Sequence, residues 1–446
     1  MRILLINPYQ TYYRVKLEGQ PMFDEPLGLG YLASYLINHD YEVRILDTLA
    51  IENVNVEQDG DYFNYGMKKK DIKRAIKAYN PDIVGITSMY TLHSKAVHDI
   101  AKIVKEVKNI LVVVGGSHAS ILPSWILSDK NIDLVVIGEG EETFLDIVKH
   151  LEKGRSMTKI PGTAIRKKGK VKINKPRPFI KDIDSIPLPA RHLLPMNLYL
   201  NDWYRQRMAM KPPRANMITS RGCLFNCVFC SIHSVWQHSW RGRSPESVVD
   251  EIEILVKKYG AKEIAFQDDN VSLNRNRMES ICDLIIERKL NIRWCTPNGI
   301  AIWTLDKKLI DKMKKSGCYK LTFGIETGCL ETQKFVRKTQ INLKKAKKII
   351  KYCNKKGMWT HSAFIIGFPY ETLEQIRETI NYAISTDLDM VTFWIATPYP
   401  GTDLYNVCKK ENLLPTGNML EWMAAVDKAA CNTKHLTAEK IQELRN

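Results

Sequence analysis

Strand-like and helix-like segments alternate five times between Met1 and Leu151, and this alternation constrains the fold more than any other feature of the sequence. The strand-like runs are short and rich in β-branched residues: RILLIN, YEVRILD, DIVGITS, ILVVVGG and DLVVIGEG. Between them, stretches such as LGLGYLASYLINH and SKAVHDIAKIVKEVK repeat apolar residues at helical spacing. Apolar strands separated by helices are typical of a parallel sheet covered on both faces. Residues 1–151 are therefore predicted to form a doubly wound, Rossmann-like α/β domain.

A second series of strands begins near residue 214. Its members are NMITS, EIAFQDD, NIRWCTPNG, KLTFGIETG, HSAFIIGFP and DMVTFWIATPYP, and helical patterns separate them. One helix is expected to begin with Ser244 as N-cap and Pro245 at its first position. Six strands with intervening helices predict a partial (β/α)6 barrel over residues 214–405, with catalytic groups at the carboxyl ends of its strands.

The remaining segments are expected to be short connecting elements. Residues 152–213 are rich in proline and basic residues and predict a connector that contains a basic hairpin turning at Gly169. Residues 406–446 are too few for another large domain and predict a short helical tail.

The net charge of +17 narrows the possible partners only weakly. In the basic run Leu343–Gly357, apolar residues recur at helical spacing and the lysines fill the opposite arc, which is typical of a solvated helix face. A nucleic-acid partner is therefore not favoured, whereas an anionic substrate or a membrane surface stays open. The sequence has no signal-peptide pattern and no apolar run long enough to span a bilayer. A cytoplasmic protein is expected, with a peripheral membrane association as the variant.

The cysteines are distributed very unevenly. The first 222 residues contain none, and then Cys223, Cys227 and Cys230 fall within RGCLFNCVFCSIH, directly after the first strand of the second series. This is not a disulfide framework, and it indicates one metal site. His233 would complete a tetrahedral zinc site. Alternatively, three thiolates would hold a 4Fe-4S cluster that has one open iron.

Small and acidic residues end other strands of the second series. FQDDN contains Asp268 and Asp269, PNG contains Asn298, and GIETG contains Glu326. These groups suit an amino group and a ribose at the open iron, although each also suits a turn or a helix cap.

These motifs together resemble a known superfamily. RGCLFNCVFC is similar to the CxxxCxΦC signature of radical S-adenosylmethionine (SAM) enzymes, and WRGRSPE, FQDDN, FGIETG, FIIGFPYET and TPYPGTDLY follow in the order seen in its cobalamin-binding branch. The resemblance extends to about Tyr405. It implies that three irons bind the cysteines, that SAM chelates the fourth iron, and that the SAM contacts are Phe229, Asp268, Asp269, Asn298 and Glu326.

The first domain resembles the cobalamin-binding domains of the same branch. No G-x-G-x-x-G follows its first strand, but PLGLGYLASYL, VVGGSHAS and VVIGEGEETF are similar to those domains. The resemblance implies that cobalamin contacts Ser88, Gly115, Gly116, Gly138, Glu139 and Gly140. The histidine motif that ligates cobalt elsewhere is absent, so base-off cobalamin without a histidine ligand is implied. The residues expected near its lower face are Tyr9, Gln10, Tyr12 and Tyr13, whereas His93 and His118 are expected to be structural.

The resemblance implies an oxygen-sensitive enzyme that cleaves SAM to a 5′-deoxyadenosyl radical and C-methylates an unactivated carbon. The implied substrate is a small molecule or a lipid, with an anionic one favoured by the charge, and flavodoxin or ferredoxin would supply electrons. One alternative is a non-methylating reaction resembling that of the anaerobic magnesium-protoporphyrin ester cyclase, and another is a cofactor-sensing binding protein. Methylthiotransferases place three further cysteines in the first domain, and this chain has none there.

Overall fold

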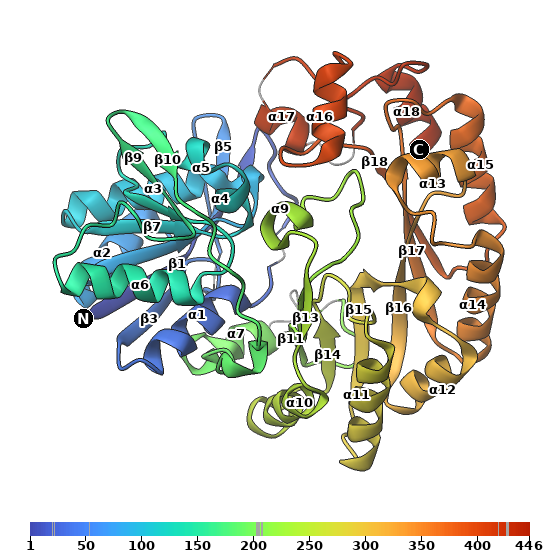
Figure 1. Cartoon of the computed structure of the whole chain (residues 1–446), viewed down its shortest axis with the longest axis horizontal. Helices are drawn as coiled ribbons and strands as arrows, with labels where there is room; N and C mark the ends of the chain where they lie inside the picture. Colours follow the sequence, from blue (N-terminus) through green and yellow to red (C-terminus); the bar gives the residue numbers. More distant parts are fainter. Residues whose placement is uncertain are drawn as a thin grey trace. The chain divides into compact units, whose positions relative to one another are not determined.

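The chain folds into two compact units, Met1–Arg207 and Met208–Asn446 (Figure 1). The computed structural model describes residues 1–19, 21, 23–52, 54–201, 206, 208–417, 419–424 and 428–446. Within the described helices, none is long and apolar enough to cross a membrane.

A seven-stranded sheet in the order β10-β9-β8-β7-β6-β1-β3 organises the first unit. Its five parallel strands confirm the predicted series: β1 (Arg2–Asn7), β3 (Glu42–Asp47), β6 (Ile83–Thr87), β7 (Leu111–Gly115) and β8 (Leu134–Val136). Strand β1 pairs with β3 on one side and with β6 on the other, so the winding direction reverses there. Ligands of such sheets bind beyond the carboxyl ends at this reversal.

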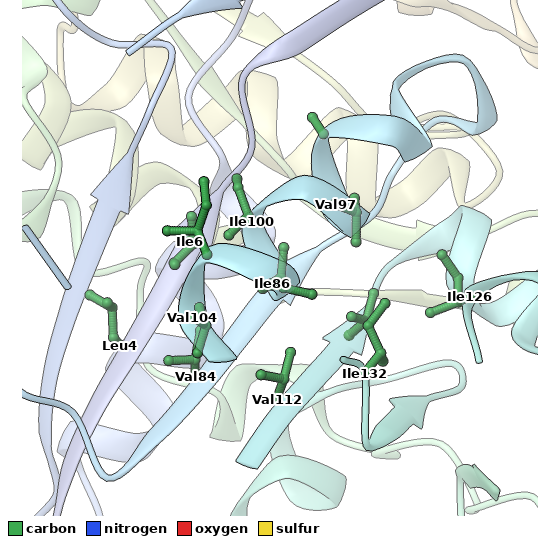
Figure 2. Packing of buried hydrophobic residues seen from close by; sticks show 14 of the residues in the cluster. Leu4, Ile6, Val84, Ile86, Val97, Ile100, Val104, Val112, Ile126 and Ile132 are labelled. Atoms are coloured by element: carbon green, nitrogen blue, oxygen red, sulfur yellow. The ribbon is translucent and has the colours of Figure 1, made fainter. Parts of the chain in front are cut away.

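Helices cover both faces of this sheet, and alternate residues of each strand enter different cores. Leu4 and Ile6 of β1 pack with Ile100 of α3 in one core (Figure 2). Ile3 and Leu5 enter the other core with residues of α1 and α6. The helices of this unit are α1 (Leu27–Ile37), α2 (Lys69–Tyr79), α3 (Ser94–Val107), α4 (Ser117–Ile121), α5 (Pro123–Ile126), α6 (Glu141–Glu152) and α7 (Met196–Asn201).

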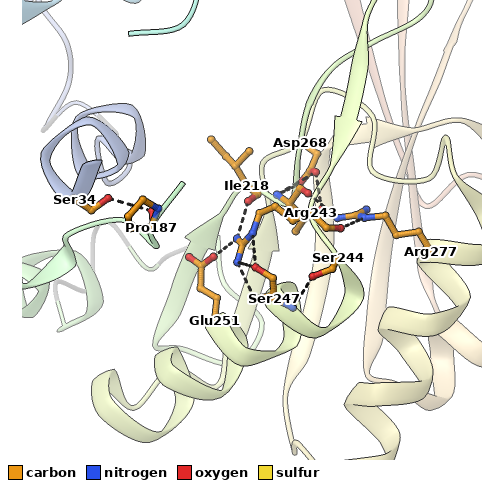
Figure 3. Close-up of polar contacts among 10 residues, drawn as sticks. Ser34, Pro187, Ile218, Arg243, Ser244, Ser247, Glu251, Asp268 and Arg277 are labelled. Carbon is orange, nitrogen blue, oxygen red and sulfur yellow. Dashed lines mark hydrogen bonds and ion pairs between the residues drawn. The ribbon is translucent and has the colours of Figure 1, made fainter. Parts of the chain in front are cut away.

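The segment expected as a connector is largely part of the first unit. Strands β9 (Thr163–Lys167) and β10 (Lys170–Ile173) form the expected hairpin, with Gly169 at its turn, and β9 pairs antiparallel with β8. Further along, the hydroxyl of Ser34 donates to the carbonyl of Pro187 at 3.1 Å (Figure 3). The amide of Ala190 donates to the carbonyl of Gly30 at 2.9 Å. Pairing at the sheet edge and these contacts attach the segment to the first unit. Its basic composition gave no indication of this attachment.

A small antiparallel sheet in the first unit was not expected from the sequence. It consists of β2 (Gln10–Tyr13), β5 (Tyr62–Gly66) and β4 (Asn55–Asp59), in the order β2-β5-β4. Its polar and aromatic strands lack the β-branched runs that mark the main sheet.

The second unit contains a parallel six-stranded sheet in the order β11-β14-β15-β16-β17-β18, which confirms the predicted second series. Its strands are β11 (Arg214–Met217), β14 (Glu263–Phe266), β15 (Arg293–Ile300), β16 (Cys318–Glu326), β17 (Trp359–Ile366) and β18 (Met390–Ile395). The ribbon β12 (Ser220–Gly222) and β13 (Trp240–Gly242) follows β11 and flanks α9 (Ile232–Trp236). The chain order strand–helix–strand gives this sheet the topology of a partial barrel.

Helices cover one face of the second sheet (Figure 1). They are α10 (Pro245–Tyr259), α11 (Arg275–Glu287), α12 (Lys307–Lys315), α13 (Leu330–Val336), α14 (Leu343–Lys355) and α15 (Leu373–Ile384). Helix α10 begins as predicted, since the Ser244 side chain accepts from the Ser247 amide and Pro245 follows. Among the described residues, helices α16 (Asp403–Lys410), α17 (Met419–Ala424) and α18 (Ala438–Arg445) follow the last strand.

Candidate active site

The cysteine loop connects β12 to α9 beyond the carboxyl end of β11. Cys227 is buried, and Cys223 and Cys230 are half-buried. The loop and helix α9 are bound to the TPYPGTDLY segment: the Leu404 amide donates to the Val228 carbonyl at 2.8 Å, and the Ser234 hydroxyl of α9 donates to the Gly401 carbonyl at 2.6 Å. A motif near the end of the second series thus holds the loop in place.

The three thiols of this loop share one electrostatic environment. Burial raises the pKa of each, and it raises the pKa of Cys230 to about 12. The thiols of Cys223 and Cys227 further raise the pKa of Cys230, which indicates that the three sulfurs lie near one another. Neighbouring buried thiolates need a compensating positive charge, and iron in an iron–sulfur cluster supplies it. The donor set therefore fits a cluster held by three cysteines.

The zinc alternative with His233 finds no support in the geometry. The imidazole of His233 stacks on that of His238, with ring centroids 5.5 Å apart. In the part of the chain that the structure describes, no three His, Cys, Asp or Glu side chains surround a single metal position. Cysteines of a cluster bind different irons, so they need not meet at one point.

Asp268 and Asp269 accept hydrogen bonds from the residues that lead into the cysteine loop. Asp268 is 2% exposed and accepts hydrogen bonds from the Thr219 amide, the Thr219 hydroxyl and the Ser220 hydroxyl. Asp269 accepts from the Gly222 amide at 3.0 Å, and burial raises its pKa to about 6. Asp268 is thus bound to the entry of the loop, whereas Asp269 accepts one hydrogen bond from the described residues and retains acceptor capacity.

A buried cationic network lies behind Asp268 (Figure 3). The Arg243 guanidinium pairs with Glu251, and their side chains are 5% and 1% exposed. Arg243 also donates to the carbonyls of Ile218 and Ser247. Arg277 donates to the carbonyls of Arg243 and Thr219, each at 2.6 Å. The WRGRSPE motif contains Arg243. The sequence did not reveal that Arg243 is hydrogen-bonded to the segment that leads to the cysteines.

Glu326 ends β16 in a left-handed conformation with φ of +68°. Its carboxylate pairs with the ammonium of Lys338 at 3.3 Å, and Lys338 also donates to the Gly324 carbonyl at 3.1 Å. The side chains of this pair are 12% and 11% exposed. The charge of Lys338 lowers the thiol pKa of Cys223 and Cys227, so this lysine lies near the cysteine loop. Lys338 was not expected from the sequence, because helix α13 separates it from the strand end at Glu326.

Phe229 and Asn298 complete the expected SAM set. The ring of Phe229 lies 6.1 Å from that of Phe368, and it borders a cavity of about 150 Å³. The remaining lining residues come from the carboxyl ends of β17 and β18: Ile365, Trp394, Ile395, Ala396, Thr397 and Tyr399. Asn298 is exposed and donates to the Gln267 carbonyl at 3.0 Å. An apolar, aromatic cavity next to the cysteine loop suits a flat ring such as adenine.

In the first unit, the predicted cobalamin residues gather beyond β6 and β7. The Ser88 amide donates to the Gly115 carbonyl at 2.6 Å, and a Cβ on Gly116 would lie 2.6 Å from the Ser88 carbonyl oxygen. The Gly138 amide donates to the Ser120 hydroxyl at 3.0 Å. Gly140 precedes α6 and borders open space. Glycine is required at position 116, where φ is +109° and the backbones approach closely.

Two buried polar atoms of this region lack a hydrogen-bond partner within the described ranges: the Ser88 hydroxyl oxygen and Nε2 of His118. Both residues are 2% exposed. The other ring nitrogen of His118 contacts the Thr91 hydroxyl at 2.9 Å, and burial lowers its pKa to about 4. Buried polar groups are normally paired, so this edge of the sheet fits a large ligand with hydrogen-bonding groups. Glu139 is bound to the Ile180 amide at 2.8 Å, which anchors the following segment.

The residues expected at the lower cobalt face belong to or precede the small sheet. Tyr9 is buried and donates to Asp99 at 2.7 Å. Tyr12 donates to Gln10 at 2.7 Å, and Tyr13 donates to Asp61 at 3.3 Å. His93 bonds the Thr11 carbonyl through Nδ1 at 2.9 Å, which is consistent with a structural histidine.

Two protein families match the two units. The B12 binding domain matches residues 24–148, and the Radical SAM superfamily matches residues 217–383. An uncharacterized methyltransferase of Pyrococcus horikoshii is 37% identical, with 100% of this chain and 90% of the relative covered. The cytidylyl-2-hydroxyethylphosphonate methyltransferase of Streptomyces wedmorensis is 33% identical, with 93% of this chain and 82% of the relative covered. An anaerobic magnesium-protoporphyrin IX monomethyl ester cyclase of Rubrivivax gelatinosus is 29% identical over 91% of this chain and 69% of its own length.

Solved structures share the fold at low sequence identity. The cobalamin-dependent SAM radical enzyme OxsB, with aqua-cobalamin and SAM bound, matches with a TM-score of 0.76 and 18% identity over 99% of this chain and 65% of its own. The radical SAM methyltransferase TsrM of Kitasatospora setae matches with a TM-score of 0.73 and 17% identity over 93% of this chain and 77% of its own. Together with two methyltransferases above 30% identity, these findings place the chain in the cobalamin-dependent radical SAM methyltransferase family.

Proposed function

We propose that this protein methylates a carbon atom of a small-molecule substrate, with a 4Fe-4S cluster, SAM and cobalamin as cofactors. The observation that carries the proposal is the grouping of three buried or half-buried cysteines in a chain whose other unit, within the described ranges, has unpartnered polar atoms at a glycine-lined sheet edge. Bound there, the cofactors together supply reductive cleavage of SAM and a transferable methyl group.

The residues around the cysteine loop divide into contacts and supports. Asp269, Asn298, Glu326 and Phe229 are proposed to contact SAM. Phe229 lies in the cysteine loop, Asp269 accepts from Gly222 next to it, and Glu326 pairs with Lys338, whose charge acts on Cys223 and Cys227. Asn298 has an exposed side chain at the carboxyl end of β15. Asp268 is proposed to position the loop, because its oxygens accept from the Thr219 and Ser220 groups that precede the cysteines. Lys338 holds the carboxylate of Glu326 in its left-handed position.

Cobalamin is proposed to lie against Ser88, Gly115, Gly116, Gly138 and Gly140, in the base-off state and without a histidine ligand. The hydroxyl of Ser88 and Nε2 of His118 are available to its polar groups. Glu139 is proposed to shape the edge indirectly, since its carboxylate holds the Ile180 amide.

The nature of the substrate follows from the relatives only in outline. The methyltransferase of Streptomyces wedmorensis is named for cytidylyl-2-hydroxyethylphosphonate, and the negative charge of a phosphonate is complementary to the +17 charge of this chain. An anionic small molecule is therefore the first class to test, with flavodoxin or ferredoxin as electron donor. The cyclase relatives make a non-methylating oxidation the second candidate.

The test begins with anaerobic reconstitution of the full chain with iron, sulfide and hydroxocobalamin, followed by gel filtration. About four irons and one cobalt per chain are expected. Candidate substrates are then incubated with SAM carrying a labelled methyl group, and product mass is measured. The control is the variant with alanine at Cys223, Cys227 and Cys230, which should retain cobalt and lose iron.

A product that gains one labelled methyl group supports the proposal. Iron without cobalt would overturn methyl transfer through cobalamin. A product that loses hydrogen and gains no methyl group would instead establish the cyclase-like alternative.

A further inference from the structure

Four polar side chains line one face of the second sheet, on strands β16, β17 and β18. They are Lys320, Thr322, His361 and Thr392, and we call them the polar floor. None of them belongs to the cysteine loop or to the expected SAM set. Their positions lie in the amino-terminal or middle part of each strand, well before the carboxyl ends.

Strand register places these residues on the same face. Thr322 pairs with His361, Lys320 pairs with Trp359, and Ala363 pairs with Thr392. Successive side chains of a strand point to opposite faces, so the intervening residues lie on the other side. Phe323 and Phe364 are fully buried there, and Phe364 packs against Tyr382 of α15. The polar floor is therefore on the inner face, opposite the covering helices.

Several hydrogen-bonding groups of the polar floor have no partner within the described ranges. The Thr322 hydroxyl oxygen is buried and unpartnered, and the residue is 7% exposed. Nε2 of His361 bonds the Thr392 hydroxyl at 3.0 Å, while its Nδ1 forms no hydrogen bond with the described residues. Burial and then the charge of Lys320 lower the pKa of His361, so the ammonium and the imidazole share one space. A buried hydroxyl without a partner is unusual unless a ligand or water satisfies it.

Among the described residues, the Lys320 ammonium forms no ion pair. Glu263 accepts from the Tyr319 hydroxyl at 2.8 Å and from the amides of Met210 and Lys211. Asp389 accepts from the amide and hydroxyl of Thr360. The charges of Lys320 and of the buried Glu263 both act on Cys295, so the floor presents an ammonium and hydroxyl donors with one buried carboxylate in its neighbourhood.

Toward the carboxyl ends of the strands, the side chains of the inner face change from polar to apolar. Ile365 lies four residues beyond His361, and Ala396 lies four residues beyond Thr392; both line the cavity beside Phe229. Four residues of a strand span roughly 13 Å. The polar floor and the cavity next to the cysteine loop are therefore about 13 Å apart along the strands, a distance that one small molecule can span.

We infer that the polar floor binds a phosphate or phosphonate group of the substrate, while the carbon to be modified lies toward the cavity at the cysteine loop. Donors from three neighbouring strands lie on one face of the sheet, which suits a tetrahedral oxyanion with several acceptor oxygens better than a planar carboxylate. The assignment of this anion to a substrate rests on the proposed methyl transfer; the anion site itself does not.

The test uses the reconstituted full chain with methylphosphonate and inorganic phosphate as separate probes, at constant ionic strength. Binding is followed by the imidazole carbon–proton NMR signal of His361, assigned with the His361→Gln variant. Both probes should shift this signal saturably, and acetate should bind at least about tenfold more weakly. Thr322→Val, which keeps the side-chain shape, and Lys320→Gln should each weaken methylphosphonate binding by roughly tenfold or more.

The matched control is Lys344→Gln, which removes the same charge from the exposed face of α14 and should leave binding unchanged. Denaturation midpoints of all variants check that each one folds. Equal binding by wild type, Thr322→Val and Lys320→Gln, or the absence of a saturable His361 shift, would overturn the anion site.

Methyl-transfer kinetics separate this inference from the proposed function. If anion binding weakens in the variants but no methylated product forms, the anion site stands and the methyltransferase proposal is refuted. Suppose that a phosphorylated or phosphonate substrate is methylated and that its KM is the same in wild type, Thr322→Val and Lys320→Gln. This result would refute the anion-site inference and leave the proposed function standing. An increase in KM with little change in kcat is the expected result.

Discussion

The two units shape their candidate sites by different means. In the first unit, the site is made by backbone: left-handed glycines let the turns after β7 and β8 approach neighbouring strands, as at Gly116 against Ser88. In the second unit, the cysteine loop has little regular structure and is held by buried charges, including the pair of Arg243 with Glu251. The first site should therefore be sensitive to added side-chain volume, and the second to the loss of a charged partner.

The largest expected effect is on the charged support of the second unit. Arg243→Met would remove the ion pair between Arg243 and the buried carboxylate of Glu251 and lower the free energy of unfolding by about 3–5 kcal/mol. Guanidinium denaturation followed by tryptophan fluorescence measures this loss. The double variant with Glu251→Leu should recover much of it, because the buried negative charge is removed as well. A single variant as stable as wild type would contradict a supporting role for the pair.

The next effect concerns a second buried carboxylate. Glu371 is 2% exposed, accepts from the amides of Gly367 and Phe368, and has a pKa raised by burial from 4.5 to about 7. Between pH 4.5 and 7 the folded state binds more protons than the unfolded state, so stability should fall as pH rises through this window, by roughly 3 kcal/mol in total. Glu371→Gln should remove this decline.

Denaturation midpoints from pH 4 to 8 test that expectation. Glu331→Gln, on the exposed surface of α13, is the matched control and should keep the wild-type slope. A Glu371→Gln profile with the same slope as wild type would show that another group titrates in this range.

A smaller effect tests the glycine-built site of the first unit. Gly116→Ala would place a Cβ 2.6 Å from the Ser88 carbonyl oxygen at a φ of +109°, which costs roughly 1–3 kcal/mol. We expect a marked loss of the cobalamin absorbance retained after gel filtration. Gly28→Ala is the control, since nothing lies within 4 Å of its added Cβ. Equal retention by both variants would contradict a backbone-built site.

The smallest effect separates helix support from site support. Ser244→Ala removes the acceptor for the Ser247 amide at the start of α10 and should cost about 1 kcal/mol. Ser244→Asp keeps an acceptor and should restore stability. Iron content should stay at the wild-type value in both variants; a large loss of iron would mean that this cap also holds the cysteine loop.

Local patterns were sufficient for the main elements because their causes are local. The β-branched runs predicted both parallel sheets, and Ser244 with Pro245 predicted the start of α10. The small sheet β2-β5-β4 escaped prediction because its strands are polar and aromatic; β4 and β5 form a hairpin of neighbouring residues, and β2 joins it from a distant part of the sequence. The hairpin at Gly169 was expected, but its pairing with β8 depends on a sheet edge that sequence spacing does not reveal.

The sequence by itself determined the strand order along the chain, the spacing of Cys223, Cys227 and Cys230, and the family resemblance, since these properties are carried by neighbouring residues. The tertiary structure alone decided which charges meet. Asp268 turned out to hold Thr219 and Ser220, Lys338 to pair with Glu326, and Lys320 to share space with His361. Such contacts join different strands and helices, and the energy of a buried charge depends on the partner that folding brings beside it.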